Sequence, residues 1–535
     1  MRHSRWVFGG AVLAVALGAL ALRLPRLDLR PMHGDEGNQA VKTAVLLETG
    51  VYRYDPRDHH GPTLYYLSLP TLWAAGVSRA ADITDGMLRL MPAILGVGVV
   101  LLLLGVGDGL GRPAAVCAGV LTAISPAMVF FSRYYVQETL LVFFTFGAMV
   151  AAWRYVRGRR VAWLLAAGGC LGLMHATKET WVIAAAAMLA ALVLALAWKR
   201  WGDGQPVALR PWLSGGRLAA AAAVAIAVSV TFFSSFFTCA RGPIDSVLTY
   251  VYYLTRAGGE GLHNHPWHYY LAMLINSRFV TGSTSGPWWT EGLILCLAVI
   301  GIFAALLRRG LGGASVPLAR FLAFYTMAMA ALYAAIPYKT PWCVLGFLHG
   351  CILLAGVGAV ALVRWVPTRP LKAVACVALA ALAAHLGWQA YRASFRFAAD
   401  QRNPYVYAHT LSDALNIVRR VEEVASVSPD GHDMMIKVIT PENYWPLPWY
   451  LRRFNQDHVG YYHEVPVDAD AAVILTTPDV QEALDRRLKG TYNKQSLHAL
   501  RPGVFVPIYV EESLWARLVE TWSARPGPAA KGGTP

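Results

Sequence analysis

Eleven apolar segments of 15 to 21 residues recur along this 535-residue chain, and they constrain its fold more than any other feature. A helix needs about 20 mostly apolar residues to cross a lipid bilayer. Charged residues make up only 15% of the sequence, whereas about a quarter is usual in soluble domains. We therefore predict a mainly α-helical, polytopic membrane protein and exclude a soluble enzyme, a disordered protein and a DNA-binding domain. The predicted spans are 6–22, 89–106, 114–131, 139–153, 161–175, 181–198, 218–237, 290–307, 321–336, 343–363 and 373–390.

A twelfth apolar run, 62–78, is ambiguous because it contains Pro62, Pro70, two tyrosines and a tryptophan. If this run lies on the membrane surface, one face of the membrane holds 17 of the 47 basic residues and only two of the 32 acids, Asp108 and Asp203. The remaining 30 basic and 30 acidic residues balance. An excess of Lys and Arg is typical of cytoplasmic loops. The basic clusters are Arg2/Arg5, Arg112, Arg154/Arg157/Arg159/Arg160, Lys199/Arg200/Arg210/Arg217, Arg308/Arg309/Arg320 and Arg364/Arg369/Lys372.

This charge asymmetry predicts eleven spans in a plasma or inner membrane, with the N-terminus in the cytoplasm and the C-terminus outside. It also explains the basic composition without a nucleic-acid partner. The first span resembles a cleavable signal peptide, because Arg2 and Arg5 precede it and Ala19-Leu20-Ala21 imitates a cleavage site. We expect this helix to be retained, since the following loop makes sense only if it is tethered to the membrane.

The sequence predicts three parts. Residues 1–390 form a transmembrane domain, whose first outer loop, 23–88, carries interfacial helices. Residues 391–525 alternate short β-like runs with helical stretches, which is typical of a small α/β domain. The expected strands are 434–440, 471–477 and 504–510, and the expected helices are 408–425 and 479–488. Residues 526–535 are rich in Gly, Pro and Ala and are expected to be a frayed tail.

The first outer loop contains an acidic pair, Asp35-Glu36, within the motif His33-Gly34-Asp35-Glu36. An amphipathic pattern follows and ends at Gly50, so the pair is expected at the start of a short surface helix. The ordinary explanation is helix capping, because acids stabilise a helix N-terminus. Adjacent side chains on a helix diverge by about 100°, so the two acids are expected to have different roles.

Five further segments on the predicted outer face combine ionisable and aromatic side chains. Each alone has an ordinary explanation, such as a loop histidine, a snorkelling side chain or a helix cap. Together they place cations, carboxylates and rings on one membrane face, where polar groups mark a site by default. The segments are His59–Tyr66 with His60, Ser132–Glu138 with Arg133, Tyr134 and Glu138, His175–Trp181 with Lys178 and Glu179, Asn264–Tyr270 with His265, and Pro337–Trp342 with Lys339.

The mixture suits an anionic substrate that carries a phosphate. Cations would bind the phosphate, aromatic rings would contact a sugar or the membrane interface, and a carboxylate would act as a base.

The order of these motifs resembles the GT-C superfamily of membrane glycosyltransferases, near its protein O-mannosyltransferase and aminoarabinose-transferase branch. The matching features are the acidic pair after the first span, the Pro-containing run from His60, and Ser125-Pro126 followed by Ser132-Arg133 and Glu138. In finer detail the chain resembles the family of flippase-activity-associated proteins, through His33–Glu36, His60–Pro62, Lys178–Thr180 and Pro337–Trp342.

The resemblance implies that a polyprenyl-phosphate-linked sugar enters from the membrane and that a glycan, lipid or protein acceptor binds from outside. It implies that Asp35 is the general base on the acceptor hydroxyl and that the anomeric configuration inverts. Developing charge on the lipid phosphate would be stabilised by Arg133, Lys178 or Lys339. No cofactor is certain, because some relatives use a divalent metal and others do not. The candidate ligands for such a metal are Asp35, Glu36, His60 and Glu138, although their spacing does not demand one.

Two other functions compete with an enzyme. The first is a non-catalytic membrane protein, either a transporter or a partner of a lipid-linked glycan flippase. A transporter would favour polar residues inside the spans and paired broken helices. Here the spans contain few polar residues, and the polar residues gather at the predicted outer face of the membrane. This distribution favours an enzyme that works at one surface. The second is a structural subunit whose C-terminal tail binds a partner. The aromatic stretch Tyr444–Tyr450 could serve acceptor binding or packing, and packing is the better interpretation.

Overall fold

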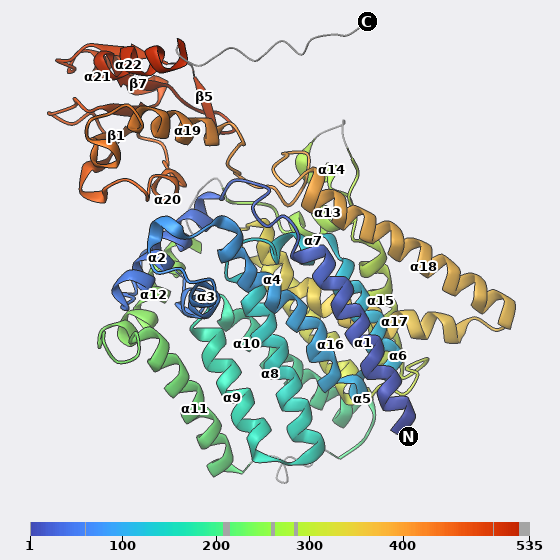
Figure 1. The fold of residues 1–535 in the computed structure, drawn as a ribbon. Helices are drawn as coiled ribbons and strands as arrows, with labels where there is room; N and C mark the ends of the chain where they lie inside the picture. Colours follow the sequence, from blue (N-terminus) through green and yellow to red (C-terminus); the bar gives the residue numbers. More distant parts are fainter. Residues whose placement is uncertain are drawn as a thin grey trace, which may run out of the picture. The chain divides into compact units, whose positions relative to one another are not determined.

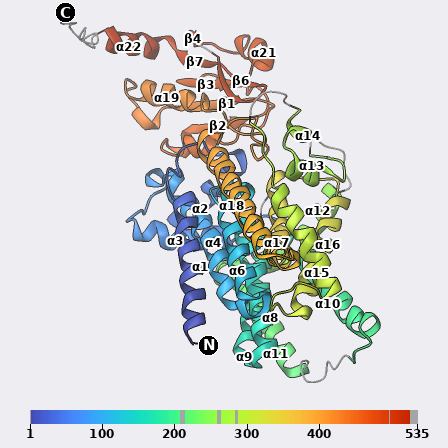
Figure 2. The same cartoon turned by 90° about the vertical axis from the view of Figure 1, so that its right-hand side faces the viewer.

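The computed structural model describes residues 2–58, 60–206, 214–257, 263–282, 287–495 and 497–523. The chain forms two compact units (Figures 1 and 2). The helical unit comprises Met1–Leu29, Val45–Ser78 and Thr84–Tyr407. The α/β unit comprises Arg30–Ala44, Arg79–Ile83 and the chain from Ala408 onward. His59 and the predicted tail 526–535 lie outside the described residues.

Each predicted span corresponds to an apolar helix of the helical unit, except that 114–131 is divided between two helices. Eight helical stretches in the described part of the chain are long and apolar enough to cross a membrane, and three shorter apolar helices accompany them. The chain is therefore a multi-pass integral membrane protein, as predicted. The helices are α1 (Arg2–Arg23), α4 (Asp85–Leu102), α6 (Arg112–Ile124), α7 (Pro126–Phe131), α8 (Glu138–Gly158), α9 (Val161–His175), α10 (Trp181–Ala197), α11 (Gly215–Phe233), α15 (Gly292–Leu307), α16 (Val316–Ala335), α17 (Leu345–Trp365) and α18 (Arg369–Tyr391).

One predicted span, 114–131, is broken into α6 and α7 at Ser125-Pro126. Proline lacks a backbone N–H and cannot continue a helix, but it is well suited to a first helical position. The Ser125 hydroxyl accepts a hydrogen bond from Met128 N at 3.3 Å and so caps α7. The break turns the chain toward the loop that carries Arg133.

The ambiguous run 62–78 folds as α3 (Thr63–Ala74), a helix of 12 residues. At 1.5 Å per residue such a helix is about 18 Å long, which is too short for a hydrocarbon core about 30 Å thick. The remaining helices of this unit are also short or polar. They are α5 (Gly107–Leu110), α12 (Gly242–Ala257), α13 (Tyr269–Ile275) and α14 (Arg278–Thr281), together with Val45–Thr49, the end of α2 (Gly34–Thr49).

Both acids of the predicted cytoplasmic face form ion pairs with the basic clusters. Asp108 lies 3.6 Å from Arg157 Nε and accepts a hydrogen bond from Trp153 Nε1 at 2.9 Å. Asp203 accepts a hydrogen bond from Arg320 Nη2 at 3.1 Å. These contacts join α5, which contains Asp108, to the end of α8, and the loop of Asp203 to the start of α16.

Reporter fusions test the predicted orientation. We expect fusions after Arg160, Arg217 and Arg369 to report a cytoplasmic location, because basic loops remain inside. Fusions after Arg79 and Asp400 should report the outer compartment. A cytoplasmic signal at Asp400 would contradict the orientation.

The α/β unit is built on a five-stranded mixed sheet with strand order β2-β1-β3-β7-β4. The strand β1 pairs in parallel with β2 and β3, while β7 is antiparallel to β3 and β4. One face packs on a core that includes Ile417 and Val421, and the other on a core with Leu484 and Tyr509. The strands are β1 (Ile436–Ile439), β2 (Val459–Tyr462), β3 (Val473–Thr476), β4 (Tyr492–Lys494), β5 (His498–Arg501), β6 (Val504–Val506) and β7 (Ile508–Glu511), and the helices are α19 (Ala414–Ala425), α20 (Leu447–Tyr450), α21 (Gln481–Asp485) and α22 (Glu512–Ser523).

The strand predicted at 504–510 is divided at Pro507, which lacks the N–H that a sheet ladder needs. The first part, β6, pairs with β5 in a separate hairpin that turns at Gly503, where φ is +80°. The second part, β7, enters the main sheet. The structure therefore confirms a small sheet domain after the membrane helices. It shows that the run 504–510 forms two strands, where one was predicted.

The α/β unit includes two pieces of the loop between α1 and α4, which was predicted as the first outer loop. The sequence did not predict that these pieces join the α/β unit. Met32 N donates a hydrogen bond to the Tyr450 hydroxyl at 2.7 Å, and Arg452 Nε donates to Ala80 O at 3.1 Å. A Cβ on Gly37 would lie 2.7 Å from Pro446 Cβ, so glycine is needed for the close packing of α2. The stretch Tyr444–Tyr450 thus packs on the start of α2, which agrees with the prediction that its aromatic residues serve packing. The boundary predicted at residue 391 remains a prediction.

Candidate functional site

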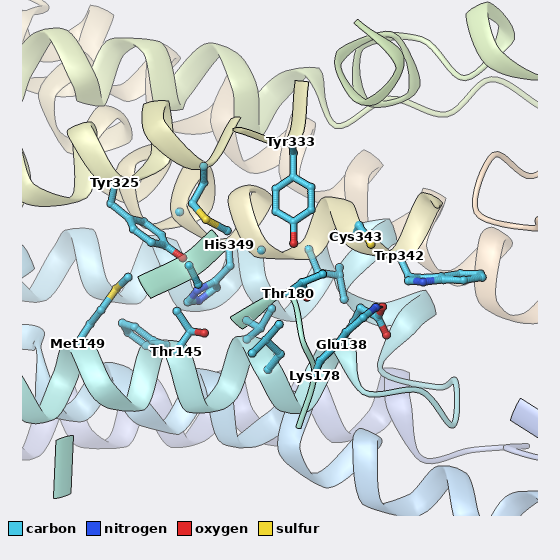
Figure 3. Close-up of a pocket in the computed structure, with 18 of the residues that line it drawn as sticks. Glu138, Thr145, Met149, Lys178, Thr180, Tyr325, Tyr333, Trp342, Cys343 and His349 are labelled. Carbon is cyan, nitrogen blue, oxygen red and sulfur yellow. The ribbon is translucent and has the colours of Figure 1, made fainter. Parts of the chain in front are cut away.

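A cavity in the helical unit lies among α8, α10, α16, α17 and the turn before α17 (Figure 3). Glu138 and Lys178 lie at one end, and Tyr325, His349 and Met149 lie at the other. The walls are mostly aliphatic and aromatic, which suits an apolar ligand with one charged end. The lining residues are Glu138, Leu141, Val142, Thr145, Phe146, Met149, Lys178, Thr180, Ala184, Tyr325, Met329, Tyr333, Trp342, Cys343, Leu345, Gly346, His349, Gly350 and Leu353.

Glu138 and Lys178 form a buried ion pair at the polar end of this cavity. Glu138 begins α8, and Lys178 lies in the loop between α9 and α10. Burial opposes the charged form of Lys178, but the Glu138 carboxylate beside it raises the pKa of Lys178 above its ordinary value. Lys178 therefore carries a positive charge at neutral pH, held at a fixed position by its partner.

The neighbouring Glu179 belongs to a second network. Its carboxylate accepts a hydrogen bond from the Tyr54 hydroxyl at 3.0 Å and lies 2.7 Å from His60 Nδ1. The Tyr253 hydroxyl lies 3.1 Å from the same ring nitrogen. Burial opposes the charged form of Glu179, but the contact with His60 outweighs it and lowers the pKa of the carboxyl group.

The motif His60-Gly61-Pro62 lies directly against the loop of Lys178. A Cβ on Gly61 would lie 2.2 Å from Ala176 O, so only glycine permits this approach. Thr63 N donates to Ala176 O at 3.1 Å, and the hydroxyls of Thr63 and Thr177 lie 2.7 Å apart. Two motifs more than 100 residues apart are thereby joined.

His265 and Lys339 lie on two segments that pair as a short antiparallel bridge at Asn264 and Tyr338. The Lys339 ammonium donates hydrogen bonds to His265 O at 3.2 Å and to Ile336 O. The His265 ring stacks on Tyr269 at a centroid distance of 4.1 Å. Burial lowers the pKa of both Lys339 and His265. Lys339 therefore holds two loops together in this structure.

Arg133 and Tyr134 are buried in structural contacts. The Arg133 guanidinium donates to Arg23 O at 2.7 Å, Pro25 O at 2.8 Å and Arg26 O at 2.9 Å. Tyr134 packs its ring against Phe130, with centroids 5.1 Å apart. Arg133 thus fixes the chain where it leaves α1. Because its guanidinium already donates to three carbonyls, Arg133 is a weaker candidate than Lys178 for binding a phosphate.

Asp35 and Glu36 lie at the start of α2 in the α/β unit, and their environments differ. Glu36 is fully buried, accepts a hydrogen bond from His33 N at 2.9 Å and pairs with Arg30 Nη2 at 3.3 Å. His33 Nδ1 in turn accepts from Asp35 N at 3.0 Å, which completes a reciprocal cap of the helix. The Asp35 side chain is 54% exposed. Its carboxylate is the acid of the pair that solvent and solutes can reach.

The structure adds Glu291, which the sequence analysis missed. This residue precedes α15 by one position and is fully buried. Its Oε1 accepts hydrogen bonds from Ser125 Oγ at 2.9 Å, Ala127 N at 2.8 Å and Tyr405 OH at 3.3 Å. The sequence signal that could have identified Glu291 is an acid directly before an apolar run, which is the pattern that identified Glu138.

Among the described residues, no group of three His, Cys, Asp or Glu side chains is arranged to hold a metal ion. The suggestion that Asp35, Glu36, His60 and Glu138 could share one thus gains no geometric support.

Comparison with known proteins gives two kinds of match. Residues 78–242 match the family model of dolichyl-phosphate-mannose-protein mannosyltransferases. Among solved structures, ArnT from Cupriavidus metallidurans bound to undecaprenyl phosphate superposes with a TM-score of 0.63 and 16% identity, covering 94% of this chain and 99% of that chain. The archaeal oligosaccharyltransferase AglB from Archaeoglobus fulgidus, in complex with an inhibitory peptide and a dolichol-phosphate, gives 0.52 and 13%, covering 95% and 74%.

These matches confirm part of the predicted resemblance. At such identities the structural likeness establishes the fold alone, so the chain has an ArnT-like fold. Residues 78–242 match the mannosyltransferase family model. No curated protein sequence matches the chain.

Proposed function

We propose that this protein is an inverting glycosyltransferase of the membrane. It moves a hexosyl or pentosyl group from a polyprenyl-phosphate donor to a glycan, lipid or protein acceptor on the extracytoplasmic face. Among the families of this class, the motifs favour the flippase-activity-associated proteins.

The observation that carries the proposal is the cavity with Lys178 at its polar end. A polyprenyl chain needs an apolar channel, and its phosphate needs a cation in a water-poor setting. Lys178 is the only Lys or Arg among the lining residues described for this cavity. The related fold of ArnT, solved with undecaprenyl phosphate, supports a ligand of this class.

In the proposed reaction the acceptor hydroxyl gives its proton to the Asp35 carboxylate. The acceptor oxygen forms a bond to the anomeric carbon while the bond from that carbon to the phosphate oxygen breaks. The electron pair leaves with the polyprenyl phosphate, and Lys178 stabilises its negative charge. The exposed carboxylate of Asp35 supports this role, whereas Glu36 is committed to the helix cap.

His60, Glu179, His265 and Lys339 support the site by fixing its loops. The network of Tyr54, Glu179 and His60 connects the first outer loop to the loop of Lys178. We assign Arg133 and Tyr134 to the scaffold that shapes the turn before Glu138.

Photo-crosslinking tests the binding part of this proposal. A polyprenyl phosphate with a diazirine near its head should label residues of the cavity wall close to Lys178 on α8 and α17, such as Leu141 and Leu345, when the protein is in nanodiscs. The matched probe without phosphate should label these positions less, because it lacks the group that Lys178 binds. Labelling confined to lipid-facing helices such as α18 would contradict the proposal.

A further inference from the structure

The helix α12 carries its apolar side chains on the outside. Ile244, Val247, Leu248 and Val251 are 62%, 64%, 44% and 62% exposed. Their spacing of three, four and seven residues places them on one face of the helix. A soluble protein buries such a stripe, so its exposure indicates that another apolar phase covers it.

The opposite face of α12 is polar and buried. Asp245, Ser246 and Thr249 are nearly inaccessible, and the Thr249 hydroxyl donates to Pro56 O at 3.0 Å. The Tyr250 hydroxyl accepts from Trp181 Nε1 at 2.7 Å, and Tyr253 contacts His60 as described above. With its polar groups inward and its apolar groups outward, α12 has the reverse of the pattern of a soluble surface helix.

The apolar surface continues into a membrane span. The helix α12 follows and packs against α11, a predicted span whose residues are mostly exposed, for example Ile226 at 63%. Between the two helices, Phe236 and Phe237 are 53% and 74% exposed. Exposed aromatic residues at the end of a span are typical of the membrane interface.

We propose that α12 lies in the membrane interface and that its partner is the boundary between lipid headgroups and acyl chains. The continuous apolar surface with α11 favours lipid over a protein partner. The helix would then be fixed by lipid on one face, while Tyr250 and Tyr253 on its other face hold the loops of Glu179 and His60. The bilayer becomes part of what positions these loops, whether or not the proposed reaction occurs.

Spin-label accessibility tests this inference without any sugar donor. A genetically encoded nitroxide amino acid is placed at Val247 in the full-length protein in nanodiscs. Ile226 of α11 is the lipid control, and Val467 of the α/β unit, which is 88% exposed, is the water control.

We expect the label at Val247 to behave like that at Ile226, with relaxation enhanced by oxygen more than by a water-soluble nickel chelate. A label as accessible to nickel as that at Val467 would overturn the proposal. Protection from both reagents would also overturn it, since a second copy or another protein would then cover the stripe. Repeating the measurement at Val251 guards against a local effect of the label.

Discussion

Asp35→Asn should lower the turnover of a verified polyprenyl-phosphate sugar by roughly 10²–10⁴-fold, the usual contribution of a general base. Asparagine retains the shape of the side chain but cannot accept the acceptor's proton. Donor binding should stay near the wild-type level, because the proposed phosphate contact is made by Lys178. The measurement is the single-turnover rate with saturating donor, together with donor affinity from a separate titration.

Glu36→Gln is the matched control for this variant. Its carboxylate is buried against Arg30 and His33, and removing one member of a buried ion pair costs about 3–5 kcal/mol. We therefore expect a lower unfolding temperature but near-normal turnover per folded molecule. Asp35→Asn should show the opposite pattern, because the Asp35 side chain is exposed. Near-full turnover in Asp35→Asn would remove it as the base.

Donor binding should weaken by about 10- to 100-fold when the cation at position 178 is removed, because hydrogen bonds to charged groups contribute about 1.5–3 kcal/mol. A single Lys178→Met substitution would leave the buried Glu138 carboxylate uncompensated. The informative variant is therefore Lys178→Met combined with Glu138→Gln, which removes both charges together. Affinity for the polyprenyl phosphate is measured in detergent or nanodiscs.

Exchange of the two charges provides the control. Lys178→Glu with Glu138→Lys keeps an ion pair in the cavity wall but moves the cation to the start of α8. If the position of the cation matters, this variant should fold and still bind the donor poorly. Wild-type affinity in both double variants would show that Lys178 does not contact the phosphate.

The spans could be predicted from sequence because long apolar runs have few alternatives in a bilayer. Charge balance then placed the run 62–78 on the surface, and α3 is indeed too short to cross. The break at Ser125-Pro126 and the division of a strand at Pro507 follow from the missing N–H of proline. Both prolines are visible in the sequence, but the effect of each depends on what packs beside it.

Tertiary contacts could not be predicted in the same way. Arg133 was a candidate for phosphate because it is a cation near the predicted outer face, yet its guanidinium donates to carbonyls at the end of α1. Glu291 was missed because a single acid beside an apolar run gives no sign of its partners. The packing of residues 30–44 against the stretch Tyr444–Tyr450 depends on Gly37 and Pro446, which lie far apart in the sequence.

The central claim, transfer of a sugar from a polyprenyl phosphate, is tested most directly by mass balance. Purified wild-type protein is incubated with a panel of polyprenyl-phosphate sugars and with cell-envelope glycans, lipids and proteins as acceptors, and the products are measured by mass spectrometry. We predict one polyprenyl phosphate released for each glycosylated acceptor, with an inverted anomeric configuration and strongly reduced product in Asp35→Asn. A protein that binds polyprenyl phosphate in the cavity of Lys178 but turns over no donor would contradict the claim and favour a non-catalytic partner of a flippase.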